Sequence, residues 1–288
     1  MWSLIPVQIA LESERNDVYS AETCKFYDIY YRNFLSLSEL SHLGKEEYFP
    51  DVVVDLHDLL SYVLLAIELG GHAILDINDE QKADLLSNQL IINVLKRYPG
   101  IKVISEEKNE KLSVVDYERY QSKQQELYAN VKTIVDLFPS RKYSLSKLAL
   151  WIDPLDATQE FTEGLFEYVS VMTCISLNGI PIFGVIYRPF TGEKVYGLNE
   201  FGIIKGNGDK WERTVLKDSS KLIMITCWEC EELASKTFFA NFTIEAAGGS
   251  GYKSLRLLNG TGQLYVHKTA IKNGTPVPVM LCFDRLVV

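Results

Sequence analysis

The strongest constraint on the fold is a short apolar segment that ends in two closely spaced carboxylates. Residues 149–152 are apolar and predict a buried strand, which runs directly into Asp153, Pro154, Leu155 and Asp156. Because proline has no amide hydrogen, Pro154 cannot extend the sheet ladder, and the chain must bend there. The bend brings both carboxylates toward one point and leaves the Leu155 carbonyl oxygen without a ladder partner. The chain therefore needs a sheet that presents an acidic loop at its edge.

Oxygen donors arranged in this way suit Mg²⁺, which binds few carboxylates and completes its octahedral shell with water and phosphate. Thr158 follows two positions after Asp156 and is expected to open a helix, whose first amides would favour a phosphate group. The aspartate pair taken alone has a second interpretation, an ordinary turn with a helix-capping aspartate. The flanking residues must decide between these readings.

Periodicity around this segment predicts alternating helical and sheet layers. Apolar residues recur every three or four positions over residues 55–75, which indicates an amphipathic helix. Gly70 and Gly71 within it indicate a close contact with a neighbour or a weakened end. Asn178 and Gly179 separate two β-rich segments and are typical of a two-residue hairpin. Further helices are expected over residues 84–97, 115–138 and 231–240, and strands over 101–104, 149–152, 168–177, 181–187, 221–226 and 264–267.

The pattern changes to shorter units beyond residue 192, which predicts a domain boundary. We expect an N-terminal extension over residues 1–50, a metal-binding α+β domain over 51–192 and a smaller α/β substrate domain over 193–288. No stretch reaches the roughly 18 uninterrupted apolar residues of a membrane span. The first residues lack the basic region of a signal peptide or anchor. The expected fold class is therefore a layered α/β fold without a visible membrane segment.

Charge and cysteine content narrow the classes of ligand. The chain has 38 acidic and 29 basic residues, a formal net charge of −9. Such a balance argues against a broad surface for nucleic acid or anionic lipid, so a phosphorylated ligand would need a metal or a few focused cations. The five cysteines are an odd and scattered set, which does not predict a disulfide framework.

Residues 151–161 together resemble the signature of the lithium-sensitive, Mg²⁺-dependent phosphomonoesterases: inositol monophosphatase, fructose-1,6-bisphosphatase and the adenosine 3′,5′-bisphosphate nucleotidases. Their pattern is Asp-Pro-(Ile/Leu)-Asp-(Gly/Ala/Ser)-Thr with an aromatic residue three positions on, which here is Phe161. A chance match at a given position has a probability below roughly one in a million. The resemblance implies the αβαβα sugar-phosphatase fold and two or more Mg²⁺ ions.

The resemblance also assigns metal ligands. Glu106, which follows the expected strand over residues 101–104, would bind the first metal together with Asp153 and the Leu155 carbonyl, and would help hold the attacking water. Asp156 would belong to a second metal site that shares Asp153. Taken without the resemblance, Glu106 and its acidic neighbour are typical of a solvated loop.

The catalytic and substrate-binding residues follow from the same resemblance. Asp84 would accept a proton from Thr158, which orients and deprotonates the water with Glu106; from its position alone, Asp84 is equally a helix N-cap. Residues 247–253 resemble the glycine-rich substrate loop of the family. The implied substrate-binding residues are Ala157, Thr158, Gly249, Ser250, Gly251 and Lys253.

Three features resemble the nucleotidase branch, in particular its Golgi-resident 3′-phosphatases. They are the sequence of residues 157–163, the 47-position step from Glu106 to Asp153, and residues 185–190. This branch implies removal of the 3′-phosphate of adenosine 3′,5′-bisphosphate to give AMP and phosphate in the Golgi lumen. Inositol monophosphatase activity and a cytoplasmic location are the alternatives. The implied partner is a small phosphorylated nucleotide rather than nucleic acid. The resemblance is also compatible with a homodimer.

The end of the chain departs from the family. A Trp-Asp pair normally completes the second metal site, whereas residues 273–276 read Asn-Gly-Thr-Pro, and Asp284 lacks the required spacing. We therefore expect an incomplete C-terminal layer, a weakened second metal site and impaired activity, or else a non-catalytic relative of the family. Cys227 and Cys230 could be half of a zinc site or a redox pair. Sequons at residues 241, 259 and 273 fit a lumenal protein.

Overall fold

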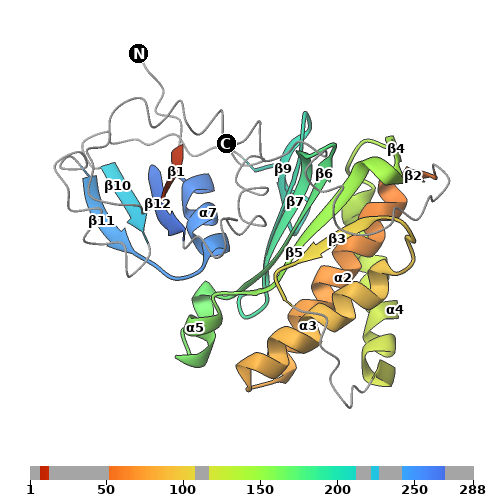
Figure 1. Ribbon diagram of the computed structural model, residues 1–288, viewed down its shortest axis with the longest axis horizontal. Helices are drawn as coiled ribbons and strands as arrows, with labels where there is room; N and C mark the ends of the chain where they lie inside the picture. The colour runs from red at the N-terminus through yellow and green to blue at the C-terminus, as the bar shows by residue number, and fades with distance from the viewer. Residues whose placement is uncertain (1–6, 13–51, 108–116, 212–221, 227–241, 270–288) are drawn as a thin grey trace.

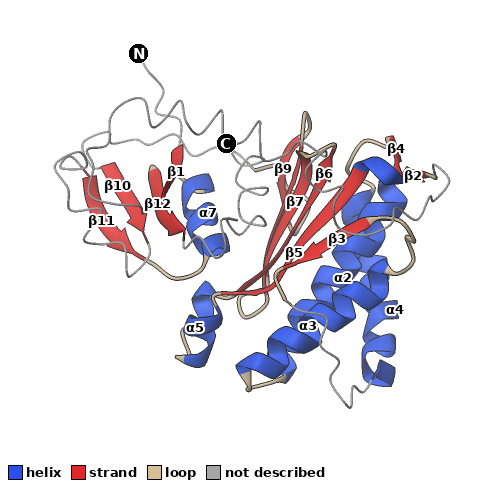
Figure 2. Ribbon diagram, in the orientation of Figure 1, coloured by secondary structure: helices blue, strands red, loops and turns tan. Residues whose placement is uncertain are grey.

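The computed structural model describes residues 7–12, 52–107, 117–211, 222–226 and 242–269 (Figure 1). The expected helix over residues 231–240, the Cys227–Cys230 pair, two of the sequons and Asp284 lie outside these ranges. The described residues form four layers in the order helices, sheet, helix and sheet (Figure 2). They match the first four layers of the expected αβαβα arrangement.

The larger sheet has six strands in the order β3-β5-β6-β7-β8-β9. Strands β3 and β5 are parallel, and each later neighbour is antiparallel. Asn178 and Gly179 have φ values of 51° and 80°, as the predicted hairpin between β6 and β7 requires. The strands are β3 (Lys102–Ser105), β5 (Leu148–Asp156), β6 (Ser170–Leu177), β7 (Ile180–Arg188), β8 (Glu193–Leu198) and β9 (Gly202–Lys205).

This sheet continues across the predicted domain boundary. Strand β8 pairs with β7 from Glu193 to Leu198, and β9 pairs with β8. A division between residues 192 and 193 would therefore cut through a hydrogen-bonded sheet. The larger sheet therefore extends to Lys205, and a short turn, in which the Thr191 and Gly192 amides donate to the Arg188 carbonyl, joins β7 to β8.

Three helices cover one face of the larger sheet (Figure 1). They are α2 (Leu56–Asp76), α3 (Glu80–Leu95) and α4 (Tyr117–Val135). The predicted close approach at the glycines of α2 is confirmed: a Cβ on Gly70 would lie 2.7 Å from Ser87 Oγ, and one on Gly71 would overlap the Tyr187 ring. In the described chain, α2 alone is long and apolar enough to cross a membrane, and 78% of its most apolar window is buried in the protein.

The second sheet has four parallel strands in the order β1-β12-β10-β11. Residues 7–12 form one of them, so part of the predicted N-terminal extension belongs to this sheet. Helix α7 lies between the two sheets (Figure 1) and packs Leu255 and Leu258 against Met172 and Ile186 of the larger sheet. The elements are β1 (Val7–Glu12), β10 (Leu222–Thr226), β11 (Phe242–Ala246), α7 (Ser250–Leu258) and β12 (Leu264–Thr269).

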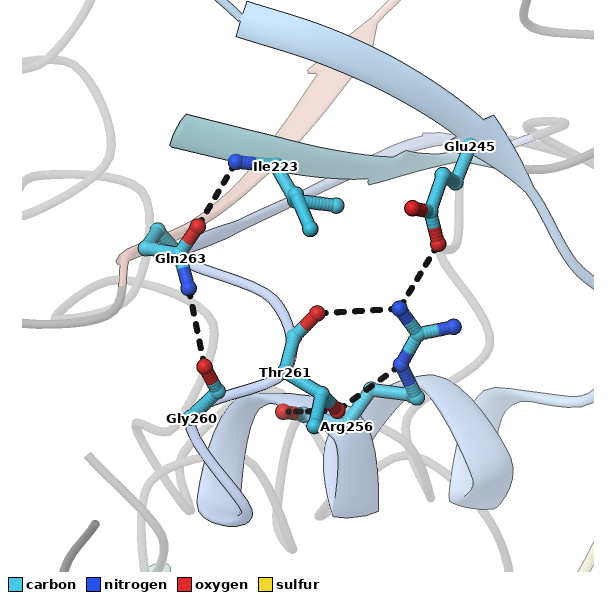
Figure 3. A network of polar contacts seen from close by, with 6 residues as sticks. All are labelled: Ile223, Glu245, Arg256, Gly260, Thr261 and Gln263. Atoms are coloured by element: carbon cyan, nitrogen blue, oxygen red, sulfur yellow. Dashed lines mark hydrogen bonds and ion pairs between the residues drawn. The ribbon is translucent and has the colours of Figure 1, made fainter. Parts of the chain in front are cut away.

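A polar network fixes the C-terminal end of α7 to the second sheet (Figure 3). The Arg256 guanidinium donates to the Glu245 carboxylate at 2.7 Å and to the Thr261 carbonyl at 2.9 Å. The Gln263 side chain accepts from the Ile223 amide at 2.6 Å, in place of a ladder partner. These bonds hold α7 so that its first turn faces the larger sheet.

The remaining described elements are short: β2 (Val53–Asp55), β4 (Lys142–Ser144), α5 (Thr158–Thr162) and the 3₁₀ turns η2 (Leu145–Lys147) and η3 (Phe166–Tyr168). One cysteine, Cys174 in β6, is disulfide-bonded. The sequence argues only against a disulfide framework, which this single residue does not test, because the other four cysteines lie outside the described residues.

Candidate active site

The two signature carboxylates lie on either side of a bulge in β5. Asp153 pairs with Met172 and Asp156 with Ser170, so three steps along β5 correspond to two along β6. The prediction that the strand ends at Pro154 is therefore wrong: the extra residue is absorbed in a bulge, which needs no amide from proline. The Pro154 carbonyl turns away from the ladder and accepts from the buried Ser87 hydroxyl of α3 at 2.8 Å.

Asp156 is fully bonded within the protein. Its Oδ1 accepts from the Ser250 amide at 2.9 Å, and its Oδ2 accepts from the Gly251 amide at 2.9 Å and from the Ser170 hydroxyl at 2.8 Å. The first amides of an α-helix have no partner inside the helix and carry partial positive charge. Asp156, which belongs to a distant strand, therefore caps α7. The partial positive charge of the helix amides offsets the negative charge of its carboxylate.

The glycine-rich loop before α7 allows this close approach. A Cβ on Gly248 would overlap the Glu160 carboxylate, one on Gly249 the Tyr168 carbonyl, and one on Gly251 the Ser170 hydroxyl. Gly249 also has a φ of 58°, a left-handed conformation that side chains rarely adopt. The predicted loop is thus a packing requirement around Asp156 and Glu160.

Asp84 and Asp153 differ from Asp156 in their hydrogen bonding. They are 6% and 7% exposed, and each has an Oδ1 atom that is buried without a hydrogen-bond partner in the described part of the chain. Burial, followed by the charges of Glu107 and Glu106, raises the pKa of Asp84 to about 8. Burial and the neighbouring charges, Asp156 first, raise the pKa of Asp153 well above its ordinary value. Among the described residues, the groups that most strongly shift these two pKa values include no cation.

The N-terminus of α3 corrects one expectation for Asp84. The N-cap of α3 is Asp79, whose carboxylate accepts from the Lys82 amide at 3.1 Å. Asp84 lies in the second turn and points into the interior, where it contributes nothing to capping. The capping interpretation is therefore wrong for Asp84, and its burial needs another explanation.

The acidic edge fits a cation by its chemistry. Glu106 follows β3, and its amide donates to the Ile152 carbonyl at 3.1 Å, which places the residue beside the bulge that carries Asp153. Buried carboxylates without partners are costly unless a metal or an opposite charge compensates them. Among the described residues, no three His, Cys, Asp or Glu side chains converge into a ready-made chelating cluster. The donors suit Mg²⁺ in type and charge, and the side chains would have to close around it.

Two predicted side chains have unexpected partners. The Thr158 hydroxyl donates to the Leu155 carbonyl at 3.2 Å, whereas the described contacts give Asp84 Oδ1 no hydrogen bond. Lys253 is buried; its Nζ donates to the Ala247 carbonyl at 3.1 Å and lies 5.3 Å from the Tyr265 ring centroid. Burial lowers the pKa of Lys253. Both predicted contacts, Thr158 with Asp84 and Lys253 with phosphate, would need a movement of the side chain.

Ala157 and Thr158 lie where the bulge passes into α5. Thr158 opens α5, as predicted, although this helix has only five residues. Ala157 precedes it with a φ of 72°, and its carbonyl accepts from the Phe161 amide at 2.9 Å. The signature therefore admits only small residues here, because a side chain in the left-handed region is strained.

The residues that sequence reasoning missed are hydroxyls. Ser170 and Ser87 are fully buried and hold Asp156 and the Pro154 carbonyl, respectively. Each lies within a segment of periodic apolar residues, and the serine itself is the only sign in the sequence of a buried hydrogen bond. The pattern of a single sequence does not separate such a serine from an ordinary small core residue.

Comparison with known proteins gives one consistent family. The profile of the Inositol monophosphatase family matches residues 73–272. "Inositol monophosphatase 3" of Danio rerio is 32% identical over 248 residues, which cover 76% of this chain and 69% of that protein. The Xenopus tropicalis protein of the same name is 31% identical, with 66% of its length covered. "Golgi-resident adenosine 3′,5′-bisphosphate 3′-phosphatase" of Mus musculus is 29% identical over 252 residues, 76% and 67% of the two chains.

Solved structures agree on the fold. Extragenic suppressor protein suhB from Bartonella henselae superposes with a TM-score of 0.56 at 16% identity, over 80% of this chain and 81% of that one. CysQ from Bacteroides thetaiotaomicron, a bacterial member of the inositol monophosphatase family, gives a TM-score of 0.54 at 18% identity, over 81% and 87%. This chain spans about two thirds of the length of the curated relatives that it matches.

Proposed function

This chain belongs to the inositol monophosphatase family of phosphatases, and from that premise we propose that it is a Mg²⁺-dependent phosphomonoesterase for adenosine 3′,5′-bisphosphate. The products would be AMP and phosphate. The observation that carries the proposal is a pair of buried carboxyl groups beside Glu106, Asp84 and Asp153, each of which has an Oδ1 atom without a hydrogen-bond partner among the described residues. Buried acidic groups that are close enough to raise one another's pKa are what a bound cation would compensate.

The residues that would hold Mg²⁺ are Glu106, Asp153 and the Leu155 carbonyl, with Asp156 toward a second ion. A bound ion supplies a water of lowered pKa and a countercharge for phosphoryl oxygens. Burial and the charges of Glu107 and Glu106 raise the pKa of Asp84 to about 8, so Asp84 can hold a proton close to neutral pH; its own charge in turn raises the pKa of Asp153. The Leu155 carbonyl, to which Thr158 now donates, would have to share its lone pairs between the hydroxyl and the ion.

Two substrates compete within the family. The nucleotide is favoured by residues 157–163 and by the relatives named as 3′-phosphatases of adenosine 3′,5′-bisphosphate. An inositol monophosphate is favoured by the relatives named Inositol monophosphatase 3, at 31% to 32% identity. A third candidate is a non-catalytic relative, because Asp156 already satisfies both of its oxygens with protein donors.

We also propose a Golgi lumenal location, by resemblance to relatives named Golgi-resident; the cytoplasm is the alternative. In the folded chain, the Thr261 hydroxyl of the described sequon at Asn259 is bonded to Arg256 (Figure 3). Endoglycosidase-sensitive mass on the expressed chain would support entry into the secretory pathway. Its loss in Asn259→Gln would place a glycan on that sequon.

The test of the proposed reaction is phosphate release by the full chain with Mg²⁺ and with a chelator. We expect Mg²⁺-dependent release from adenosine 3′,5′-bisphosphate that is faster than from inositol 1-phosphate. Asp153→Asn should lower turnover by at least about 10²-fold, because it removes an atom that would bind the metal itself rather than one that only contacts a metal ligand. Asp136→Asn, an exposed aspartate beyond α4, is the matched control and should leave turnover unchanged. Equal or faster turnover of inositol 1-phosphate would reject the nucleotide as the preferred substrate.

A further inference from the structure

Three phenylalanine rings form a cluster near the acidic bulge, which we name the aromatic platform: Phe161, Phe166 and Phe190. The rings of Phe166 and Phe190 are stacked, with centroids 4.4 Å apart and planes at 16°. Phe161 meets them at 5.6 Å and 6.2 Å and is buried. Phe166 is 40% exposed, which is unusual for a large apolar side chain in a cluster. The platform is therefore anchored in the core and open to solvent at one ring.

The platform lies next to the candidate active site. Phe161 belongs to α5, which begins two positions after Asp156. The Cβ position of Gly249 would overlap the Tyr168 carbonyl and lies 3.2 Å from Asp156 Oδ2. The turn η3, which carries Phe166 and Tyr168, is thus in contact with the same point of the glycine-rich loop as Asp156. Phe166 therefore lies in the same short turn as Tyr168, the residue that meets this loop.

The backbone of η3 is firmly held. The Arg188 guanidinium donates from Nε to the Glu167 carbonyl at 3.1 Å and also pairs with the Glu193 carboxylate. The Tyr168 ring meets the Tyr252 ring of α7 edge-to-face, with centroids 4.9 Å apart. A ligand that binds on the platform would not have to order these residues first, which lowers the entropic cost of binding.

We propose that the aromatic platform is the surface on which the base of a nucleotide substrate stacks. The proposal rests on the function proposed above and names a specificity determinant for it. Every base has a flat π face, and stacking on an aromatic side chain is worth about 1–3 kcal/mol per base. A hydroxylated inositol ring is not planar and cannot stack in this way. Phe166 and Phe190 carry no hydrogen-bonding groups, so the platform should accept adenine and guanine alike.

The test compares a substrate that has a base with one that lacks it. KM and kcat are measured for adenosine 3′,5′-bisphosphate and for ribose 3,5-bisphosphate with the wild type and Phe166→Ala. We expect the KM for the nucleotide to rise about 5- to 150-fold, while the KM for the sugar bisphosphate changes less than about twofold. Phe166→Trp should restore the nucleotide KM. An equal change for both substrates, or no change for the nucleotide, would overturn the proposal.

Two further measurements keep the inference separate from the proposed reaction. Ile180→Ala, at the exposed hairpin between β6 and β7, is the matched apolar control and should leave both KM values unchanged. If the chain hydrolyses neither substrate, the proposed reaction fails, and calorimetric binding of adenosine against ribose tests the platform alone. Equal adenosine binding by the wild type and Phe166→Ala would then overturn it. A dimer in sedimentation that Phe166→Ala dissociates would also overturn it, by assigning Phe166 to a contact between two copies.

Discussion

The two ends of one bulge show opposite ways of burying a carboxylate. Asp156 is met by two helix amides and a hydroxyl, and the protein itself neutralises it. Asp153, three residues earlier, and Asp84 across from it each keep an oxygen without a partner in the described chain. Under the proposed function, Asp153 and Asp84 would be compensated by a cation, whereas the hydrogen bonds to Asp156 also hold α7 against the larger sheet.

The largest effect that would test this contrast is the pH dependence of stability. Because the pKa of Asp84 is raised from 3.8 to about 8 in the folded state, the folded chain keeps a proton that the unfolded chain has lost. The stabilisation is complete below about pH 4 and is lost as the pH rises through 8. A shift of that size corresponds to about 6 kcal/mol. Urea unfolding without Mg²⁺ should therefore show lower stability at pH 8 than at pH 5.

Asp84→Asn isolates this contribution. The variant lacks the titrating group, so its stability should change much less between pH 5 and pH 8 than that of the wild type. If the unfolding free energies of the two proteins changed with pH in parallel, the charge of Asp84 would be compensated in the folded chain. The contrast with Asp156 would then be removed.

Exchange of each aspartate of the bulge for asparagine is the next test. Asp156→Asn places an amide group against three donors and should cost about 2–4 kcal/mol of unfolding free energy. Asp153→Asn removes a buried acidic group that keeps one oxygen without a partner in the described chain, and it should be neutral or stabilising by about 1 kcal/mol in the metal-free chain. Unfolding of both variants in urea at pH 7 measures the difference. Equal destabilisation by the two substitutions would contradict the division of the site.

A smaller effect should follow from Ser170→Ala, which deletes one of the three donors to Asp156. A hydrogen bond to a charged group is worth about 1.5–3 kcal/mol. We expect a loss in this range in thermal unfolding, with Ser170→Thr restoring part of it. Ser146→Ala, on the exposed turn η2, is the matched control. A loss no larger than that of the control would show that the helix amides alone hold Asp156.

The smallest effect concerns the backbone between the bulge and α5. Ala157 has a φ of 72°, so Ala157→Gly should relieve strain and stabilise the chain by about 0.5–1 kcal/mol. Ala83→Gly, within α3, should have the opposite sign because glycine weakens a helix interior. Denaturant midpoints measure both. Destabilisation by Ala157→Gly would mean that the alanine methyl contributes packing to the site.

The sequence predicted those parts of the molecule that local chemistry determines. The helix over residues 56–76 follows from its apolar periodicity, and the hairpin at Asn178 follows from its turn residues. The signature residues were found for the same reason, because their spacing is itself the pattern.

The rest depends on contacts between distant residues. Asp156 and Ser250 are 94 positions apart, and nothing in either segment shows that one caps the other. The bulge in β5 replaced the expected strand end because β6 supplies Ser170 as a pairing partner beyond Pro154. The cap of α3 was misplaced for a local reason, since Asp79 and Asp84 are both acceptable caps, and only the buried environment of Asp84 distinguishes them.

The central claim, that the acidic edge is built for a cation, is tested most directly by calorimetric titration of the full chain with Mg²⁺ at pH 7. Metal binding should displace the proton held among Asp84, Asp153 and Glu106, so the heat should depend on the ionisation enthalpy of the buffer. We predict such proton-coupled binding in the wild type and in Asp136→Asn, and its loss in Asp153→Asn. Binding of equal strength in Asp153→Asn, or no binding by the wild type, would contradict the account.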